Sequence, residues 1–133
     1  MTSTSGGDYV SGNKLAVLVP MMYVKSVPRS VEFYTRLGFV ARHIHHPEGV
    51  PEPVWAWVQC NAAQLMLTQA SAPVKAEEQA VLFYLYVPDV AAFRDELRGK
   101  DLEPGEIQYP FYAPHGEFRV TDPDGYALMI SHT

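Results

Sequence analysis

The sequence predicts an α+β fold in which two βαβββ modules form a curved mixed sheet. We expect one helix from each module to cover the convex side, which leaves a ligand groove on the concave side. Two observations carry this prediction. The strand and helix patterns occur twice, in the same order, along the 133 residues. Val24 and Met66 also recur as Val87 and Met129 at the same separation, which indicates an internal duplication.

The first module is predicted to span residues 15–69. It begins with LAVLVPMMYV (15–24), an almost wholly apolar run that predicts a buried strand. In SVPRSVEFYTRLGF (26–39) apolar residues recur at helical spacing, and Gly38 suits a helix end. Three strands are expected to follow, the last two as a hairpin; they are FVARHIHH (39–46), VWAWVQC (54–60) and AQLMLTQ (63–69).

The second module repeats this order after a polar linker, residues 70–79, and is predicted to span residues 80–131. VLFYLYV (81–87) predicts a strand, and PDVAAFRDELRGK (88–100) predicts a helix with one apolar face. The last two strands flank a Pro-Asp-Gly turn, in which proline fixes φ and glycine supplies a left-handed position. The three remaining strands are expected at EIQYPFY (106–112), EFRVTD (117–122) and YALMIS (126–131).

Length and composition indicate one globular domain, residues 15–133, behind a Ser, Thr and Gly-rich tail (1–14) that we expect to be disordered. The single cysteine, Cys60, allows no internal disulfide, and neither a long apolar run nor a signal pattern is visible. We therefore expect a cytoplasmic protein that does not enter membranes. The net charge is −5 and the basic residues are scattered, which disfavours nucleic-acid binding.

Two segments carry a family resemblance. SVEFYTRLGF (30–39) and RVTDPDGYALMI (119–130), together with the repeated strand and helix order, resemble the vicinal-oxygen-chelate superfamily. That superfamily includes glyoxalase I, extradiol dioxygenases, and the fosfomycin-resistance and bleomycin-resistance proteins. The resemblance covers residues 15–131, and it is more specific for the fold than for the reaction.

Metal-dependent members of that superfamily hold their ion with a His or Gln in the opening strand and a Glu in the closing strand of each module. At the matching positions this sequence has Val19 and Leu82 in the opening strands, and Met66 and Met129 in the closing strands. Hard divalent cations need oxygen or nitrogen ligands, whereas a thioether is a soft ligand. We therefore expect no metal, no other cofactor and no catalytic residue at these positions.

The alternation of side chains along strands predicts what lines the groove instead. A two-residue hairpin turn would pair Trp57 with Met66 in the first module, and a three-residue turn would pair Arg119 with Met129 in the second. Aromatic and thioether side chains suit a flat organic ligand, although aromatic residues also suit a core or a subunit interface. The predicted ligand-binding residues are Met21, Tyr23, Trp55, Trp57, Met66, Tyr84, Tyr86, Phe111, Tyr112, His115, Arg119 and Met129.

The histidines offer a different kind of site. His43 and His45 are expected on one strand face about 6.6 Å apart, which is too far to chelate a metal without a further ligand. His115 and Glu117, with the two tyrosines of VLFYLYV, are the candidates for general acid–base chemistry. Exposed histidines beside loops explain the same pattern without any catalytic role.

The sequence leaves two main functions open and a third that it favours less. The first is a metal-free protein, similar to the bleomycin-resistance branch, that sequesters an aromatic or cationic antibiotic or natural product in a hydrophobic groove. That resemblance implies a homodimer in which both chains line each groove. The second is an enzyme of the superfamily, a lyase, isomerase or dioxygenase with non-standard catalytic residues. The third is a sensor or partner module without a small ligand. The apolar ligand positions favour the binding protein.

Overall fold

The computed structural model describes residues 12–133, so most of the predicted tail lies outside the described residues. The first module contains β1 (Met21–Val24), α1 (Val27–Leu37), β2 (Val40–His45), β3 (Trp55–Cys60) and β4 (Ala63–Gln69). A short 3-10 helix, η2 (Ala76–Glu78), lies in the linker. The second module contains β5 (Phe83–Val87), α2 (Val90–Arg98), β6 (Glu117–Thr121) and β7 (Ala127–His132).

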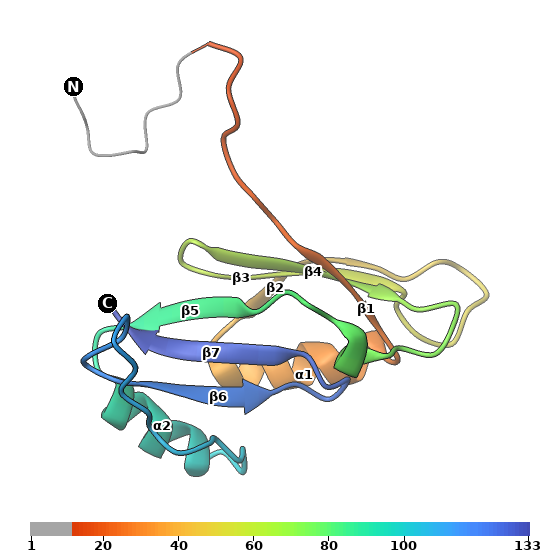
Figure 1. Ribbon diagram of the computed structural model, residues 1–133. Helices are drawn as coiled ribbons and strands as arrows, with labels where there is room; N and C mark the ends of the chain where they lie inside the picture. Colours follow the sequence, from red (N-terminus) through yellow and green to blue (C-terminus); the bar gives the residue numbers. More distant parts are fainter. Residues whose placement is uncertain (1–11) are drawn as a thin grey trace.

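The strands form two mixed sheets rather than one continuous sheet. The first sheet has the order β1-β4-β3-β2, and the second has the order β5-β7-β6. The opening and closing strands of each module pair in parallel, and the other pairs are antiparallel. Figure 1 shows α1 beneath the first sheet and α2 beneath the second. The predicted α+β fold of two modules is therefore confirmed, with one helix on one side of each sheet.

The strand registers confirm the duplication and both turn predictions. Met21 pairs with Met66 in the first module, and Tyr84 pairs with Met129 in the second, so the two parallel pairs have equivalent registers. Trp57 also pairs with Met66, across a hairpin turn in which Asn61 adopts a left-handed φ of 54°. In the second module Arg119 pairs with Met129, as a three-residue turn requires. The side chains predicted to share a face therefore do so.

The prediction of a long first strand is wrong. Strand β1 contains only the last four residues of LAVLVPMMYV. The residues before it run away from the body of the molecule in Figure 1, with Leu15 fully exposed and Leu18 88% exposed. Pro20 has no N–H group to donate to a neighbouring strand, so regular pairing with β4 begins after it. Its carbonyl still accepts a hydrogen bond from Met66 N at 2.8 Å.

The prediction of a strand at 106–112 is also wrong. This segment makes only an isolated bridge between Gln108 and Glu117. Pro110 cannot donate to a strand ladder, and its carbonyl accepts from Ala113 N at 2.9 Å in a tight turn. The chain therefore leaves the sheet at this proline and forms a loop, and the second module has one strand fewer than predicted.

Both predicted helices are present, and Gly38 ends the first one as predicted. Ser26 caps the start of α1, where its Oγ accepts from Arg29 N at 3.3 Å, and Gly38 ends the helix with φ 113°. Asp89 caps α2 by accepting from Ala92 N at 3.0 Å. These side chains satisfy backbone N–H groups that have no partner within a helix. No helix within residues 12–133 is long and apolar enough to cross a membrane.

Strand alternation directs one face of each sheet toward its helix and leaves the other face open. In β1, β3 and β4 most residues on the helix side are buried, whereas their neighbours along each strand are half-buried or exposed. The edge strand β2 has no buried residue. In the second sheet the helix-side residues of β6 and β7 are mostly buried, but Glu117, Ala127 and Ser131 on the opposite side are buried as well, and β5 has no buried residue. The buried residues of the two sheets form one continuous core. The largest fully buried side chains include Tyr34, Leu67, Leu97, Phe118, Leu128 and Ile130.

A hydrogen bond between the modules joins the two sequence motifs that carried the resemblance. Tyr34 of α1 donates its hydroxyl to Asp122 Oδ2 at 2.8 Å, at the turn between β6 and β7. The other carboxylate oxygen of Asp122 accepts from Asp124 N at 2.9 Å and from Tyr126 N at 2.8 Å. Tyr34 is completely buried and Asp122 is 4% exposed. The turn is therefore fixed both to itself and to the first module.

Further bonds extend this contact along the start of α1. Asp124 Oδ1 accepts from Lys25 N at 2.9 Å, and Asp124 Oδ2 accepts from Ser30 Oγ at 3.4 Å. The carbonyl of Pro123 accepts from Arg29 Nη2 at 2.8 Å. The negative side chain of Asp124 thus lies near the N-terminus of a helix, where the helix dipole favours it. We refer to these bonds, with that of Tyr34, as the α1–turn contact.

Burial shifts the pKa values of Tyr34 and Asp122, the two partners of the central bond in the α1–turn contact. Desolvation raises the pKa of Asp122, although the bonds from Tyr34 and from the two backbone N–H groups oppose that shift. Burial, followed by the charge of Asp122 and the hydrogen bond to it, raises the pKa of Tyr34 far above its ordinary value of 10.0. Tyr34 therefore keeps its proton at neutral pH and acts as the donor.

We predict that Tyr34→Phe lowers the free energy of unfolding by roughly 1–3 kcal/mol, because it removes one donor from a buried carboxylate. Urea denaturation followed by circular dichroism measures this change. Tyr109→Phe removes the hydroxyl of a tyrosine that is 67% exposed and is expected to leave the stability unchanged. Equal effects of the two substitutions would contradict the importance of the Tyr34 bond.

Candidate functional site

The open face of the first sheet is a surface of aromatic and thioether side chains. The registers place its residues in two rows across the sheet, one centred on Met66 and one on Thr68. The first row contains His43, Trp57, Met66 and Met21, and the second contains His45, Trp55, Thr68 and Tyr23. We call these eight residues the indole face. Because the rows are continuous across four strands, a flat molecule would find an extended apolar surface here.

The two indoles are held in a fixed arrangement. Their ring centroids lie 6.4 Å apart with an interplanar angle of 79°, and His43 lies 6.3 Å from the ring of Trp57. Trp57 Nε1 donates to Gln64 Oε1 at 3.0 Å, which satisfies the polar atom of the ring. Trp55 and Trp57 are both half-buried. The protein therefore covers neither indole completely, and part of each remains available for a contact.

The open face of the second sheet is more polar. Its two rows contain Tyr84, Met129 and Arg119, and then Tyr86, Ser131 and Glu117. We call these six residues the tyrosine face. The rings of Tyr84 and Tyr86 lie 6.3 Å apart with an interplanar angle of 31°, so their faces point in similar directions. Neighbouring phenol faces of this kind attract cations as well as flat rings.

Two hydroxyl groups connect Tyr84 to the buried carboxylate of Glu117 in the same face. Tyr84 donates to the hydroxyl of Tyr112 at 3.5 Å, and Tyr112 donates to Glu117 Oε2 at 3.3 Å. Both bonds are long for hydroxyl donors. The hydrogen bond to Tyr112 raises the pKa of Tyr84 above its ordinary value of 10.0, and burial and the charge of Glu117 add to this shift. Tyr84 is therefore a neutral phenol at physiological pH.

The loop between Gln108 and Glu117 carries the remaining predicted site residues. Phe111 is 93% exposed and Tyr112 is 59% exposed, and their rings meet edge to face at 5.3 Å. His115 stacks on His132 at 4.9 Å, at the end of β7. The loop therefore brings Tyr112 to the tyrosine face through its hydroxyl, whereas the ring of Phe111 projects into solvent and His115 pairs with another histidine.

Two cavities lie where the modules meet. One of about 590 Å³ joins the edges of the two open faces, because Met21 and Gln64 reach it from the first sheet and Tyr84 from the second. Exposed Leu18 and Leu82 also line it. It is the place where the structure brings residues of the indole face and the tyrosine face together.

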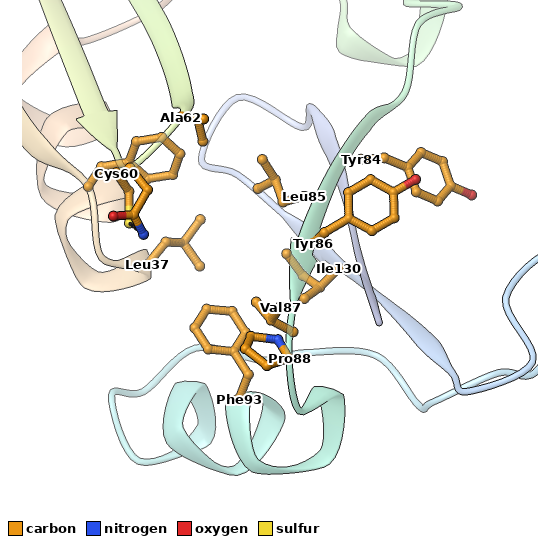
Figure 2. A pocket seen from close by; sticks show the side chains of 13 residues that line it. Leu37, Cys60, Ala62, Tyr84, Leu85, Tyr86, Val87, Pro88, Phe93 and Ile130 are labelled. Atoms are coloured by element: carbon orange, nitrogen blue, oxygen red, sulfur yellow. Dashed lines mark hydrogen bonds between the residues drawn. The ribbon is translucent and has the colours of Figure 1, made fainter. Parts of the chain in front are cut away.

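The other cavity, of about 500 Å³, lies beside β5. Figure 2 shows Leu37 and Cys60 across from Val87, with Tyr84 and Tyr86 on the far side of the strand. The side chains that face each other here belong to the helix sides of the two sheets or to the edge of the core. This cavity is thus a gap at the edge of the common core, between the two modules, rather than the predicted groove.

The predicted site residues consequently form two groups rather than one lining. Trp57 pairs with Trp55 and with His43, whereas Tyr84 pairs with Tyr86. Only the edges of the two groups meet, at the larger cavity. Sequence reasoning missed Ser131, which is 4% exposed within the tyrosine face. Its position two residues after Met129 on the same strand was the signal that pointed to it.

The residues of this chain at the positions where metal-dependent members of the superfamily bind their ion do not suit a hard cation. The opening-strand residues that lie beside Met66 and Met129 are Met21 and Tyr84, two positions later than predicted from the motifs. Leu82 precedes β5 and is 51% exposed. Thioethers and a neutral phenol are not the oxygen and nitrogen donors that Mg²⁺, Mn²⁺, Zn²⁺ or Fe²⁺ require. The correction of the register therefore leaves the chemical conclusion unchanged.

The histidines do not form a replacement ligand set in the described chain. His43 and His45 lie on the indole face and are exposed, whereas His115 lies at the far end of the second sheet beside His132. Within residues 12–133 no group of three His, Cys, Asp or Glu side chains is arranged to hold a metal ion. Cys60 has a free thiol.

The sequence matches the family model described as Glyoxalase/Bleomycin resistance protein/Dioxygenase superfamily over residues 15–130. The chain belongs to this superfamily. A comparison with curated proteins gives no match. Membership fixes the fold and leaves the reaction or ligand open, because the superfamily's own description spans resistance proteins and dioxygenases.

Solved structures of this superfamily include close likenesses in fold at low sequence identity. A bleomycin-binding protein complexed with bleomycin has a TM-score of 0.69 at 15% identity, over 87% of this chain and 97% of that chain. The bleomycin resistance determinant encoded on transposon Tn5 has a TM-score of 0.70 at 16% identity, over 87% and 96%. The bleomycin-binding protein of Streptomyces verticillus, complexed with copper(II)-bleomycin, has a TM-score of 0.67 at 18% identity, over 90% and 98%.

We predict that Tyr112→Phe lowers the pKa of Tyr84, because it removes the hydroxyl that makes the largest contribution to the upward shift. A pH titration followed by NMR of ¹³C-labelled tyrosine side chains measures the change at Tyr84. Tyr109→Phe, which alters a neighbouring exposed residue of the same loop, is the control and is expected to leave that pKa unchanged. An unaltered Tyr84 titration in Tyr112→Phe would contradict the hydroxyl chain.

Proposed function

We propose that this protein is a metal-free binding protein that sequesters an aromatic or cationic small molecule, in the manner of the bleomycin-resistance proteins. The observation that carries the proposal is the indole face, in which half-buried Trp55 and Trp57 lie in continuous rows with Met21 and Met66. Stacking on each aromatic ring contributes roughly 0.5–1.5 kcal/mol beyond the burial of apolar area. Methionine adapts to irregular ligand shapes.

The chemistry of the superfamily's metal positions supports the same function. A glyoxalase-like lyase or a dioxygenase needs a metal to polarise or activate its substrate, and Met66 and Met129 supply no ligand for one. The neutral state of Tyr84 also argues against its use as a base. Similarity in fold to two bleomycin-binding proteins and a bleomycin resistance determinant favours a planar or cationic natural product as the ligand class.

A second copy of the chain is part of this proposal. Leu15, Val17 and Leu18 are 100%, 66% and 88% exposed, and Phe111 and Tyr86 are exposed near the other open face. Exposed apolar side chains of this number are characteristic of surfaces that another protein covers. A homodimer would bury them and would bring an indole face toward a tyrosine face, so that both chains line each groove. The free thiol of Cys60 is compatible with the proposed cytoplasmic location.

We predict that bleomycin or the planar cation 9-aminoacridine binds at micromolar concentration and quenches tryptophan fluorescence. Trp57→Leu is expected to weaken binding about tenfold, which corresponds to the loss of one stacked ring and its buried area. Isothermal titration calorimetry measures the affinity. Ile44→Ala is the matched control, because Ile44 is an exposed apolar residue of the same sheet that lies outside the indole face.

Two results would contradict the proposed function. One is the absence of binding of both compounds by the wild-type protein. The other is near-stoichiometric Fe, Mn, Ni or Zn in the purified protein, removable together with a catalytic activity, which would favour the enzyme. Inductively coupled plasma mass spectrometry of protein purified without chelators measures the metal content.

We predict that the protein sediments with the mass of two chains and that the double substitution Leu15→Glu, Leu18→Glu converts it to a single chain. Two charges in place of these largely exposed apolar side chains cannot be buried in an interface without a large desolvation cost. Val40→Glu with Val50→Glu adds the same charge elsewhere on the surface and is expected to leave the dimer intact. A wild-type protein that sediments as one chain at high concentration would contradict this part of the proposal.

A further inference from the structure

Glu117 is a buried carboxylate that the described chain leaves incompletely satisfied. It is 4% exposed, and its Oε2 accepts one long bond from Tyr112. Its Oε1 is buried and has no hydrogen-bond partner within residues 12–133. A carboxylate has room for about four hydrogen bonds, and a buried charge costs free energy when it lacks partners. Glu117 therefore favours a positive charge nearby.

No cation of the described chain supplies that charge. The salt bridges among residues 12–133 involve Glu32, Glu96 and Glu106, and none includes Glu117. Arg119 lies two residues further along β6 on the same face, but it is exposed and forms no ion pair with Glu117. Arg119 is the basic residue of the tyrosine face, whose other members are uncharged except Glu117 itself. The negative charge of Glu117 thus has no positive partner in the described structure.

The hydroxyl chain carries the effect of this charge to the open surface. Glu117 accepts a hydrogen bond from the hydroxyl of Tyr112, and the oxygen of Tyr112 accepts a hydrogen bond from the hydroxyl of Tyr84. The oxygen of Tyr84 is then left as an acceptor, because its only proton is already donated. Hydrogen bonds in a chain polarise one another, and an adjacent carboxylate strengthens that effect. A donor group in the groove would therefore find an electron-rich acceptor without reaching Glu117.

The neighbouring rings add a second attraction for a cation. The faces of Tyr84 and Tyr86 point in similar directions, 6.3 Å apart, and Tyr86 is 61% exposed. A positive charge over phenol faces is attracted by their quadrupoles, and the buried negative charge of Glu117 in the same sheet face is screened less by salt than a surface charge would be. Tyr84 also lines the cavity of about 590 Å³ that meets the indole face.

We propose that the Glu117–Tyr112–Tyr84 chain is a subsite for the amino group of a cationic ligand, so that the preferred ligands carry a positively charged N–H donor attached to, or conjugated with, a flat aromatic body. This inference rests on the proposed binding function and specifies the class of ligand. The amine donates to the oxygen of Tyr84, and the flat body extends toward the indole face. Tyr112 is a positioning residue, because it acts through Tyr84 and Glu117.

The test compares 9-aminoacridine with acridine at about pH 8, where the first is a planar cation and the second is its uncharged parent. Calorimetry with the full chain gives the affinity of each probe. Glu117→Gln is expected to weaken the binding of 9-aminoacridine about tenfold or more and to change the affinity for acridine less than about twofold. Glu103→Gln, which alters the net charge equally at an exposed residue outside both faces, is expected to change neither.

Tyr112→Phe tests the connection rather than the charge. It leaves Glu117 in place but removes the hydroxyl through which Tyr84 is oriented, so we expect weaker 9-aminoacridine binding and unaltered acridine binding.

Thermal unfolding separates a role of Glu117 in ligand binding from a structural role. Because Glu117→Gln removes an incompletely satisfied buried charge, its midpoint is expected to equal or exceed that of the wild type.

The outcomes distinguish this inference from the function on which it rests. If the wild type binds both probes and Glu117→Gln changes neither affinity, the amine subsite is wrong and the binding function stands. If Glu117→Gln lowers the unfolding midpoint and weakens both probes equally, Glu117 is structural and the subsite is wrong. If the wild type binds neither probe, the binding function fails and the subsite fails with it.

Discussion

The hydrogen bond between Tyr34 and Asp122 is the constraint on which the arrangement of the two modules depends. Each module has its own sheet and its own helix, and the turn between β6 and β7 rests on the start of α1. The bond is short, at 2.8 Å, and both partners are buried. Desolvation makes the Asp122 charge costly, and the bonds from Tyr34 and from two backbone N–H groups offset that cost. The FYTRLGF and DPDGY segments, which lie in different modules, are joined by the bond between Tyr34 and Asp122.

Fixing the modules in this way decides which surfaces are left for function. Strand alternation directs one face of each sheet into the common core and leaves the other open. The indole face is the open side of the first sheet and the tyrosine face that of the second. Where enzymes of the superfamily need carboxylates and imidazoles, the strand pairs carry Met21 beside Met66 and Tyr84 beside Met129. The same scaffold positions therefore favour contact with apolar or aromatic molecules over metal chemistry.

Two buried carboxylates in the second module illustrate the difference between a structural group and one that is open to a ligand. Asp122 accepts three hydrogen bonds, and the turn around it is rigid as a result. Glu117 accepts one long bond and keeps an oxygen without a partner. Both are 4% exposed, so burial alone does not separate them. The number of hydrogen-bond donors separates them. A carboxylate whose oxygens all have donors stabilises the fold, whereas a carboxylate with an oxygen that lacks a donor still attracts an incoming cation.

The sequence by itself determined the order of strands and helices except for the strand expected at 106–112, the duplication, the two hairpin turns and the residues that share each sheet face. Those features depend on local patterns: side chains alternate along a strand, and Gly38 ends a helix wherever the helix packs. It did not determine that Pro20 and Pro110 would end strand pairing, since an apolar run predicts a strand wherever a partner is available. Only the tertiary structure decided that the indoles and tyrosines form separate faces, and that Tyr112 reaches Glu117 from a loop. These relations join residues through space, and periodicity along the chain carries no information about them.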